Sequence, residues 1–371
     1  MIEHINDLGA DWVSPPGATI TDLLEERGWT QRDLVKRVRS SEKHISQLIS
    51  GQVSLSEEMA VKLAAVLGST PAFWITRESQ YRATIVQREY KEKLASWVGW
   101  LDELPVRELM KLKCIEKRRL TEKAKPEVVD MVLKFFRCSS PDAWANLYGK
   151  QQAAFRITNQ AQGKHRSAIT AWLRAGEDQI ESRGIEMPNY DRIVFLDALK
   201  EIRSLTVLDV EEFEPLLKEY LASAGVSLAF VPAFKGTKVS GAARWLSRSQ
   251  PLIQLSLFGK WSDRFWFTFF HEAAHILYKH DTKMVFLDDG PGGNSDRQEV
   301  QANNWAADML IPKEYAKQLN KVCKSDNAIK GFAKKINIHP GIVVGRMQHE
   351  RLIPPSHFNH LKARYEIKLE N

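Results

Sequence analysis

The sequence predicts a multidomain, mainly α-helical protein. We expect an all-α N-terminal domain (1–85), a helical connector (86–189) and a C-terminal α+β domain with a small sheet (190–371). Three observations support this prediction. The 371 residues exceed the usual size of one domain. Capping residues and glycines divide residues 17–76 into four or five short helices. Beyond residue 190, helical segments are interspersed with segments of alternating polarity, which are typical of strands.

The composition excludes several classes of protein. A hydrophobic content of 43% with 27% charged residues is typical of a globular chain and not of a disordered one. The apolar runs are too short to span a membrane, and the first residues lack the pattern of a secretory signal. The three cysteines match no disulfide framework and no cysteine-based metal site. We therefore expect a cytoplasmic protein without a membrane partner.

The net charge of +7 suggests a polyanionic partner, but the positive charge is local. The first 76 residues hold seven Lys/Arg and ten Asp/Glu, yet residues 31–46 hold five basic residues and two acids. A second basic run, 106–126, holds eight basic residues and three acids. We interpret this second run as the solvated face of a helix, because phosphate binding needs clustering in space as well as in sequence.

Capping residues predict the N-terminal helices. The expected N-caps are Thr21, Thr30, Ser41 and Ser56, and Gly28 and Gly51 are expected to close the first and third helices. The Pro-Pro-Gly sequence at 15–17 is expected to end an irregular arm. Short helices joined by short turns have the proportions of a helix-turn-helix. The apolar seam between its two helices is predicted to consist of Leu34, Val38, Ile45 and Leu48.

The second helix of this pair is predicted to present polar side chains to DNA. Gln47 can pair with adenine, Lys43 with guanine and Glu42 with cytosine in the major groove. A side chain at a helix start or at the turn is placed for backbone phosphates. The predicted DNA-binding residues are Gln31, Arg39, Glu42, Lys43, His44 and Gln47.

About 70 residues, from PPGATITDLLEERGWTQ to GSTPAFWI, resemble HigA-type antitoxins of the XRE helix-turn-helix class. The resemblance implies a dimeric repressor that binds double-stranded operator DNA, with a toxin as a further partner. Arg39 stands where this family has a turn glycine, and Val35 stands where it commonly has alanine. The alternative is a helical module kept for dimerisation or partner binding.

The stretch FTFFHEAAHILYKH, residues 267–280, contains the pattern HExxH. On a helix, His271 and His275 lie one turn apart, so both imidazoles can reach one ion. Glu272 lies beside them and can take a proton from water without being a ligand. The alternative is a buried core helix in which the two histidines are incidental.

Catalytic zinc usually takes three protein ligands, so a third is needed. Glu299 in EVQANNWAADMLIP is preferred, because the small residues Ala302, Ala306 and Ala307 let its helix pack closely on the helix that carries HExxH. Asp281 and His280 are the weaker alternatives, since Tyr278 stands where the metzincin turn needs glycine.

HEAAH followed by Glu-x-x-Ala-Asn, an aromatic residue, Ala-Ala and Leu-Ile-Pro resembles the ImmA/IrrE metallopeptidases, gluzincin-like proteins whose substrates are typically DNA-binding repressors. The resemblance covers about 226–348 and implies a zincin-like fold that binds Zn²⁺. It implies His271, His275 and Glu299 as ligands and Glu272 as general base. Trp305 replaces the more frequent phenylalanine.

These patterns together predict a DNA-binding transcriptional regulator, of antitoxin or repressor type, with a zinc metallopeptidase domain. We hypothesise that the peptidase cleaves the chain itself, near residues 76–96, or a partner repressor, and thereby relieves repression. We expect a homodimer that binds operator DNA and a toxin or repressor protein. One alternative is a non-catalytic antitoxin-repressor whose C-terminal domain docks a toxin or senses metal or stress. Another is a peptidase whose helical head only recruits substrate.

Overall fold

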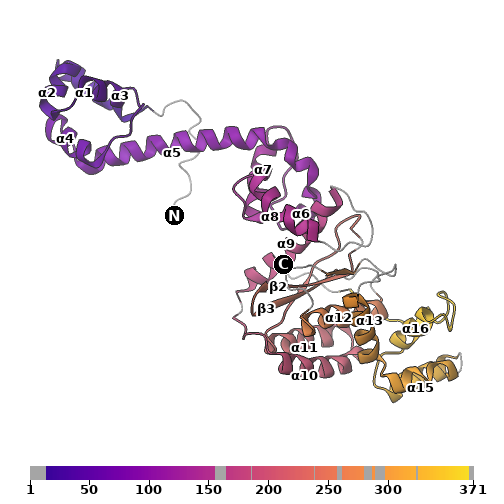
Figure 1. Ribbon diagram of the computed structural model, residues 1–371. Coiled ribbons are helices and arrows are strands. Elements are labelled where there is room, and N and C mark those ends of the chain that lie inside the picture. Colours follow the sequence, from indigo (N-terminus) through magenta and orange to yellow (C-terminus); the bar gives the residue numbers. More distant parts are fainter. Residues whose placement is uncertain are drawn as a thin grey trace. The chain divides into compact units, whose positions relative to one another are not determined.

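The computed structural model describes residues 14–154, 164–184, 186–237, 239–256, 261–279, 286–288, 297–322 and 325–366. The chain divides into two compact units, Met1–Ser96 and Trp97–Asn371 (Figure 1). The boundaries at residues 85 and 189, between the N-terminal domain, the helical connector and the C-terminal domain, stay a prediction.

The described part of the first unit, residues 14–96, is all α, as predicted. Its helices are α1 (Pro16–Glu26), α2 (Gln31–Val38), α3 (Glu42–Ile49), α4 (Glu57–Leu67) and α5 (Pro71–Ser96). Three predicted caps are confirmed, since side chains at 30, 41 and 56 accept hydrogen bonds from backbone N–H groups three residues on. The predicted seam of Leu34, Val38, Ile45 and Leu48 is at most 2% exposed.

The predicted start of the first helix was wrong. Helix α1 begins at Pro16, whose fixed φ favours the first helical position. Thr21 therefore lies inside the helix, where its hydroxyl donates to the carbonyl of Gly17 at 3.0 Å. A Cβ on Gly17 would lie 2.0 Å from the carbonyl oxygen of Ile49, so α1 and α3 approach closely only because this residue is glycine.

The second unit begins with short helices. They are η1 (Val98–Glu103), α6 (Val106–Lys111), α7 (Lys125–Phe136), α8 (Pro141–Ala154) and α9 (Lys164–Arg183). The interpretation of residues 106–126 as one helical face was wrong. Only 106–111 and the start of α7 are helical, and an irregular segment without helix or strand joins them.

Among the described residues, four strands form the sheet of the second unit. They are β1 (Ser227–Phe230), β2 (Gly241–Ser247), β3 (Gln250–Leu255) and β4 (Phe286–Asp288), in the order β1-β3-β2-β4. β1 pairs with β3 in parallel, and the other two pairs are antiparallel. The predicted small, partly antiparallel sheet is therefore confirmed.

Helices cover both faces of this sheet. On one face, Gln254 of β3 donates to the carbonyl of Trp172 in α9 at 2.7 Å. On the other face, Ala243 and Ile253 join the core formed with α10 (Arg192–Ser204), α11 (Val210–Ser223) and α12 (Ser262–Leu277). Figure 1 shows β2 and β3 between these two helical layers. Alternation along the strands therefore separates a polar face from an apolar one.

The remaining elements of the second unit are helical. They are η2 (Leu205–Val207), α13 (Arg297–Leu310), α14 (Lys313–Ala316), η3 (Leu319–Lys321), α15 (Asp326–Lys335), α16 (Pro340–His349) and η4 (Asn359–Leu361). Helix α12 packs on α13 and α16 as well as on the sheet. Within the residues that the structure describes, no helix combines the length and apolar character needed to cross a bilayer.

Candidate metal centre

Helix α12 brings the HExxH residues into the interior of the second unit. Its residues from Thr268 to Leu277 are all buried, because the sheet, α13 and α16 enclose it. His271 and His275 lie one turn apart on the side of α13, and their rings are 4.7 Å apart. The prediction that these histidines share one helical face is therefore confirmed.

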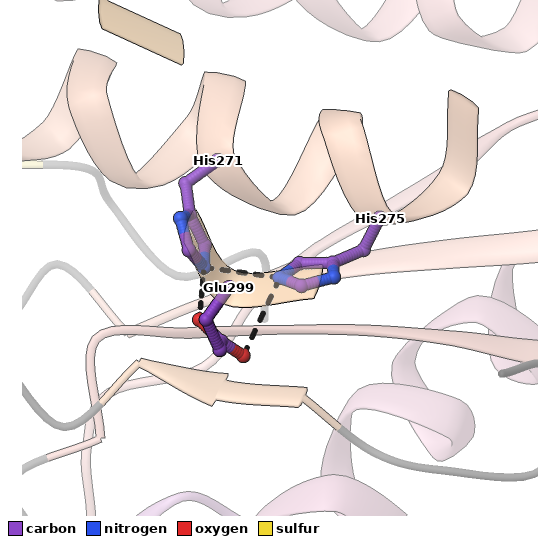
Figure 2. A group of neighbouring side chains, drawn as sticks. All are labelled: His271, His275 and Glu299. Atoms are coloured by element: carbon purple, nitrogen blue, oxygen red, sulfur yellow. Dashed lines mark hydrogen bonds and ion pairs between the residues drawn. The ribbon is translucent and has the colours of Figure 1, made fainter. Parts of the chain in front are cut away.

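Glu299 completes a group of three side chains, with His271 and His275, whose ligand atoms could hold one metal ion; these atoms are called the three donors below (Figure 2). The Nε2 atoms of His271 and His275 are 3.1 Å apart. Glu299 lies 3.3 Å from the Nε2 of His271 through Oε2 and 3.7 Å from the Nε2 of His275 through Oε1. Ligand atoms at about 2.0–2.1 Å from a tetrahedral zinc ion are about 3.3 Å from one another. The three donors therefore fit zinc in both type and spacing.

Small residues allow the close approach of α13 to α12. Ala302 and Ala306 are fully buried, while Ala307 is half-buried. Glu299 lies in the first turn of α13, and its side chain is only 12% exposed. A carboxylate this deeply buried beside two imidazoles favours a cation between them. The weaker ligand candidates, His280 and Asp281, lie outside the described residues.

Asn303 holds the ring of His271, a role that sequence reasoning missed. The Nδ1 of His271 lies 3.0 Å from Asn303 Oδ1. Because the amide oxygen can only accept a hydrogen bond, Nδ1 carries the proton. The lone pair of Nε2 is therefore available to a metal ion held with His275 and Glu299. Asn303 follows Glu299 by four residues on α13, so helical spacing was the signal that could have identified it.

Glu272 lies against strand β2 and is fully buried. A Cβ on Gly241, the first residue of β2, would lie 2.9 Å from both Cγ and Oε1 of Glu272. The same Cβ would lie 2.7 Å from Cγ2 of Thr268. Gly241 therefore provides the space for this carboxylate. A glycine inside a strand pattern signals such an approach, but its neighbour cannot be identified from sequence.

The six predicted DNA-binding residues all lie on α2, α3 or the turn between them. Gln31 is exposed at the start of α2, and Glu42 and Lys43 are exposed in the first turn of α3. His44 and Gln47 are half-buried. Glu42 forms an exposed ion pair with Arg32 on α2, at 3.2 Å. Their contact with DNA stays a prediction.

Arg39 ends α2 with φ +51° and ψ +56°, the left-handed conformation that favours glycine. Its backbone N–H donates to the carbonyl of Val35, and its side chain is exposed. The turn therefore needs the conformation that a glycine provides, and arginine adopts it at a cost of about 1–2 kcal/mol. This leaves a guanidinium at the helix-turn-helix surface.

Comparison with known proteins assigns a family to each part. Residues 20–74 match the helix-turn-helix family, and residues 242–346 match the IrrE N-terminal-like domain of the M78 peptidases. The HTH-type transcriptional regulator YddM of Escherichia coli (strain K12) is 30% identical over 66 residues, which are 18% of this chain and 70% of that protein. Antitoxin HigA-1 of Vibrio cholerae serotype O1 is 33% identical over 72 residues, 19% of this chain and 68% of the antitoxin. The two resemblances inferred from the motifs are confirmed.

Proposed function

We propose that this protein is a transcription regulator that hydrolyses peptide bonds with zinc. The chain belongs to the HigA-like helix-turn-helix regulators and carries a C-terminal IrrE-like peptidase domain. It binds operator DNA as a homodimer and cleaves itself or a partner repressor to relieve repression. The observation that carries this proposal is the convergence of His271, His275 and Glu299, with Glu272 directly after His271 in the same helix.

In the metal centre, some side chains hold the ion and another moves a proton. Zinc held by the three donors would supply a Lewis acid that polarises the peptide carbonyl and makes water more acidic. Glu272 is not one of the three donors. Its carboxylate accepts the proton of the attacking water and returns it to the amide nitrogen that leaves. Asn303 keeps His271 in the tautomer that offers Nε2.

The first unit supplies operator recognition. Helix α3 presents Lys43 on its exposed side, with Gln47 one turn later. Both side-chain types pair with base edges in the major groove. Glu42 is the weaker base contact, because its carboxylate already pairs with Arg32. The likeness to an antitoxin supports a toxin as a second partner.

The test separates metal binding from cleavage. Wild type, Glu272→Gln and His271→Ala are purified, and the zinc of each is measured by elemental analysis. Wild type and Glu272→Gln are expected to hold about one zinc per chain, while His271→Ala loses it. Only wild type is expected to cleave an added unfolded protein or itself. Equal cleavage by wild type and Glu272→Gln, or the absence of zinc from both, would contradict the proposal.

The non-catalytic antitoxin is the second candidate, and the identity to HigA-1 favours it. In that case the zinc centre stabilises a docking or sensing domain. Glu272→Gln then leaves repression and its relief unchanged, because this substitution spares all three donors. His271→Ala would abolish toxin binding or the response to metal. A reporter gene behind the operator distinguishes the two candidates when both variants are compared.

A further inference from the structure

Residues 76–96, the first expected site of self-cleavage, have the wrong conformation for a peptidase. They lie inside α5, a continuous helix of 26 residues. A peptide that pairs with the edge of a sheet must be extended, so that its backbone N–H and C=O groups are free to bond. In α5 those groups are engaged in helical hydrogen bonds. Cleavage there would first require several turns of α5 to unwind.

The segment between α6 and α7 has the opposite properties. Residues 116–123 are eight consecutive exposed residues outside helices and strands, the longest such run in the described part of the chain. Within the described residues, the backbone N–H groups of 115–120 donate to no other backbone group. Their N–H groups can therefore bond to another strand without giving up a backbone hydrogen bond, and among their carbonyls that of Arg119 accepts from the N–H of Thr121 at 2.8 Å.

Both ends of this segment are anchored. Ile115 is 6% exposed, and the N–H of Cys114 donates to the carbonyl of Leu109 at 3.0 Å. At the other end, the N–H groups of Ala124 and Lys125 donate to the carbonyl of Thr121 at 2.9 and 3.0 Å. The segment is thus presented as a loop between two fixed points.

Another irregular stretch, residues 186–190, is partly exposed but is held in place. The N–H of Tyr190 donates to the carbonyl of Ser249 at 3.0 Å. The backbone of Pro188 and Asn189 lies so close to Gly225 that a Cβ there would be 2.5 Å from the carbonyl oxygen of Pro188. A peptidase cannot lift this stretch away without breaking that packing.

We propose that the peptidase cleaves this chain between residues 116 and 121, in the exposed loop that joins α6 to α7. This inference depends on the proposed peptidase function. One water molecule is consumed: its oxygen bonds to the carbonyl carbon, the C–N bond breaks, and the nitrogen leaves with a proton as a new amine. Glu272 carries that proton. The products are an N-terminal fragment with all of α1–α6 and a C-terminal fragment with the metal centre.

Cleavage in this loop breaks the covalent connection between the helix-turn-helix and the residues that follow the loop. Helix η1 contacts α7 across the loop. In the intact chain this contact is intramolecular and benefits from a high effective concentration. After cleavage it joins two separate molecules, and dilution in the cell favours their separation. The released fragment keeps the helix-turn-helix but loses every residue after the cut.

The experiment uses full-length Glu272→Gln protein as substrate, with a C-terminal tag, and untagged zinc-loaded wild type as enzyme. Mass spectrometry of the products locates the cut. We expect one new C-terminus between residues 116 and 121. A cut elsewhere in the chain, or cleavage of a partner repressor alone, overturns this inference and leaves the peptidase proposal standing. Zinc-loaded wild type that cleaves no protein at all overturns both.

A matched pair of variants tests the backbone argument. Arg119→Pro removes an N–H that donates to no other backbone group in the described part of the chain, so folding should not suffer. Arg119→Ala removes the same side chain and keeps the N–H. If the loop binds as a strand, the proline variant should be cleaved at least about tenfold more slowly than the alanine variant. Equal rates in the two variants would contradict strand-like binding of this loop.

Discussion

Substituting Gly241 by alanine should slow catalysis without removing the metal. The added Cβ would lie 2.7 Å from Thr268 Cγ2 and 2.9 Å from the Cγ and Oε1 of Glu272. Carbon atoms in contact normally sit about 3.5–4.0 Å apart, so the neighbours must move by about 0.6–1.3 Å. Strand β2 is hydrogen-bonded on both sides, so its backbone is held in place and the side chain of Glu272 must take up the displacement.

The expected magnitude follows from that displacement. A catalytic group misplaced by about 1 Å can cost about 100-fold in rate. This corresponds to about 2.7 kcal/mol in the activation free energy. Overpacking should also lower the free energy of unfolding by about 1–3 kcal/mol. The three metal donors are not among the atoms nearest to the added methyl group, so zinc should be retained.

The assay measures zinc per chain and the cleavage rate for Gly241→Ala and for a control. Gly331→Ala is the control, because a Cβ at Gly331 on α15 meets nothing within 4 Å. The control should keep the wild-type rate and gain slightly in stability, since alanine suits a helix. Cleavage by Gly241→Ala at the wild-type rate, with zinc bound, would refute the role assigned to Gly241. Loss of zinc would show that the methyl group disturbs the donors instead.

Four further predictions follow. Asn303→Ala should weaken zinc binding about 10–100-fold in a chelator competition, because His271 loses its hydrogen-bond partner. Asn303→Asp should restore zinc binding. Equal zinc affinity in wild type and both variants would exclude the role of Asn303 in holding His271. Arg39→Gly should relieve about 1–2 kcal/mol of backbone strain and slow hydrogen exchange of the α2 amides about 5–30-fold, and faster exchange would contradict this. Ser41→Ala should lower stability by about 1 kcal/mol, because the Ser41 hydroxyl accepts from the N–H of His44 at 3.1 Å and caps α3. Amide hydrogen exchange in α3 should become faster, and unchanged exchange would mean that water replaces the cap. Burial, with the charge of Asp178, raises the pKa of the Cys114 thiol to about 11, so its thiolate is scarce at pH 8. Labelling of Cys114 at pH 8 should therefore be about 100-fold slower than in the unfolded chain, and the labelling rate should rise as the pH approaches 11. Peptide mapping after labelling at several pH values checks this.

The sequence predicted the parts of the structure that depend on local spacing. A cap such as Ser41 bonds to a group three residues away, and HExxH places two histidines one helical turn apart. The ligand candidate Glu299 was reached through small residues at helical spacing, which indicate a close helix pair. In each case the relevant contact lies within one element or is marked by a distinctive pattern.

The parts that sequence could not predict depend on tertiary packing. Nothing local to Gly241 identifies Glu272 as its neighbour, because 31 residues separate them along the chain. The same is true of Gly17, which allows α1 to approach Ile49. The basic run 106–126 was misjudged because charge alone does not distinguish a solvated helix face from a solvated loop.

Buried polar contacts explain why helices after the α6–α7 loop stay with the sheet. Arg174 on α9 bonds to Glu177 at 3.0 Å and to the carbonyl of Phe135 in α7 at 2.9 Å. Arg244 on β2 bonds to the carbonyl of Leu173 and lies 3.4 Å from Glu177. Breaking a buried pair leaves an uncompensated charge, at a cost of about 3–5 kcal/mol. Separating α9 from the sheet would expose the guanidinium groups of Arg174 and Arg244 or leave them without their partners. The chain is therefore more readily divided in the exposed loop before α7 than at residue 189, where the sequence alone had suggested a boundary.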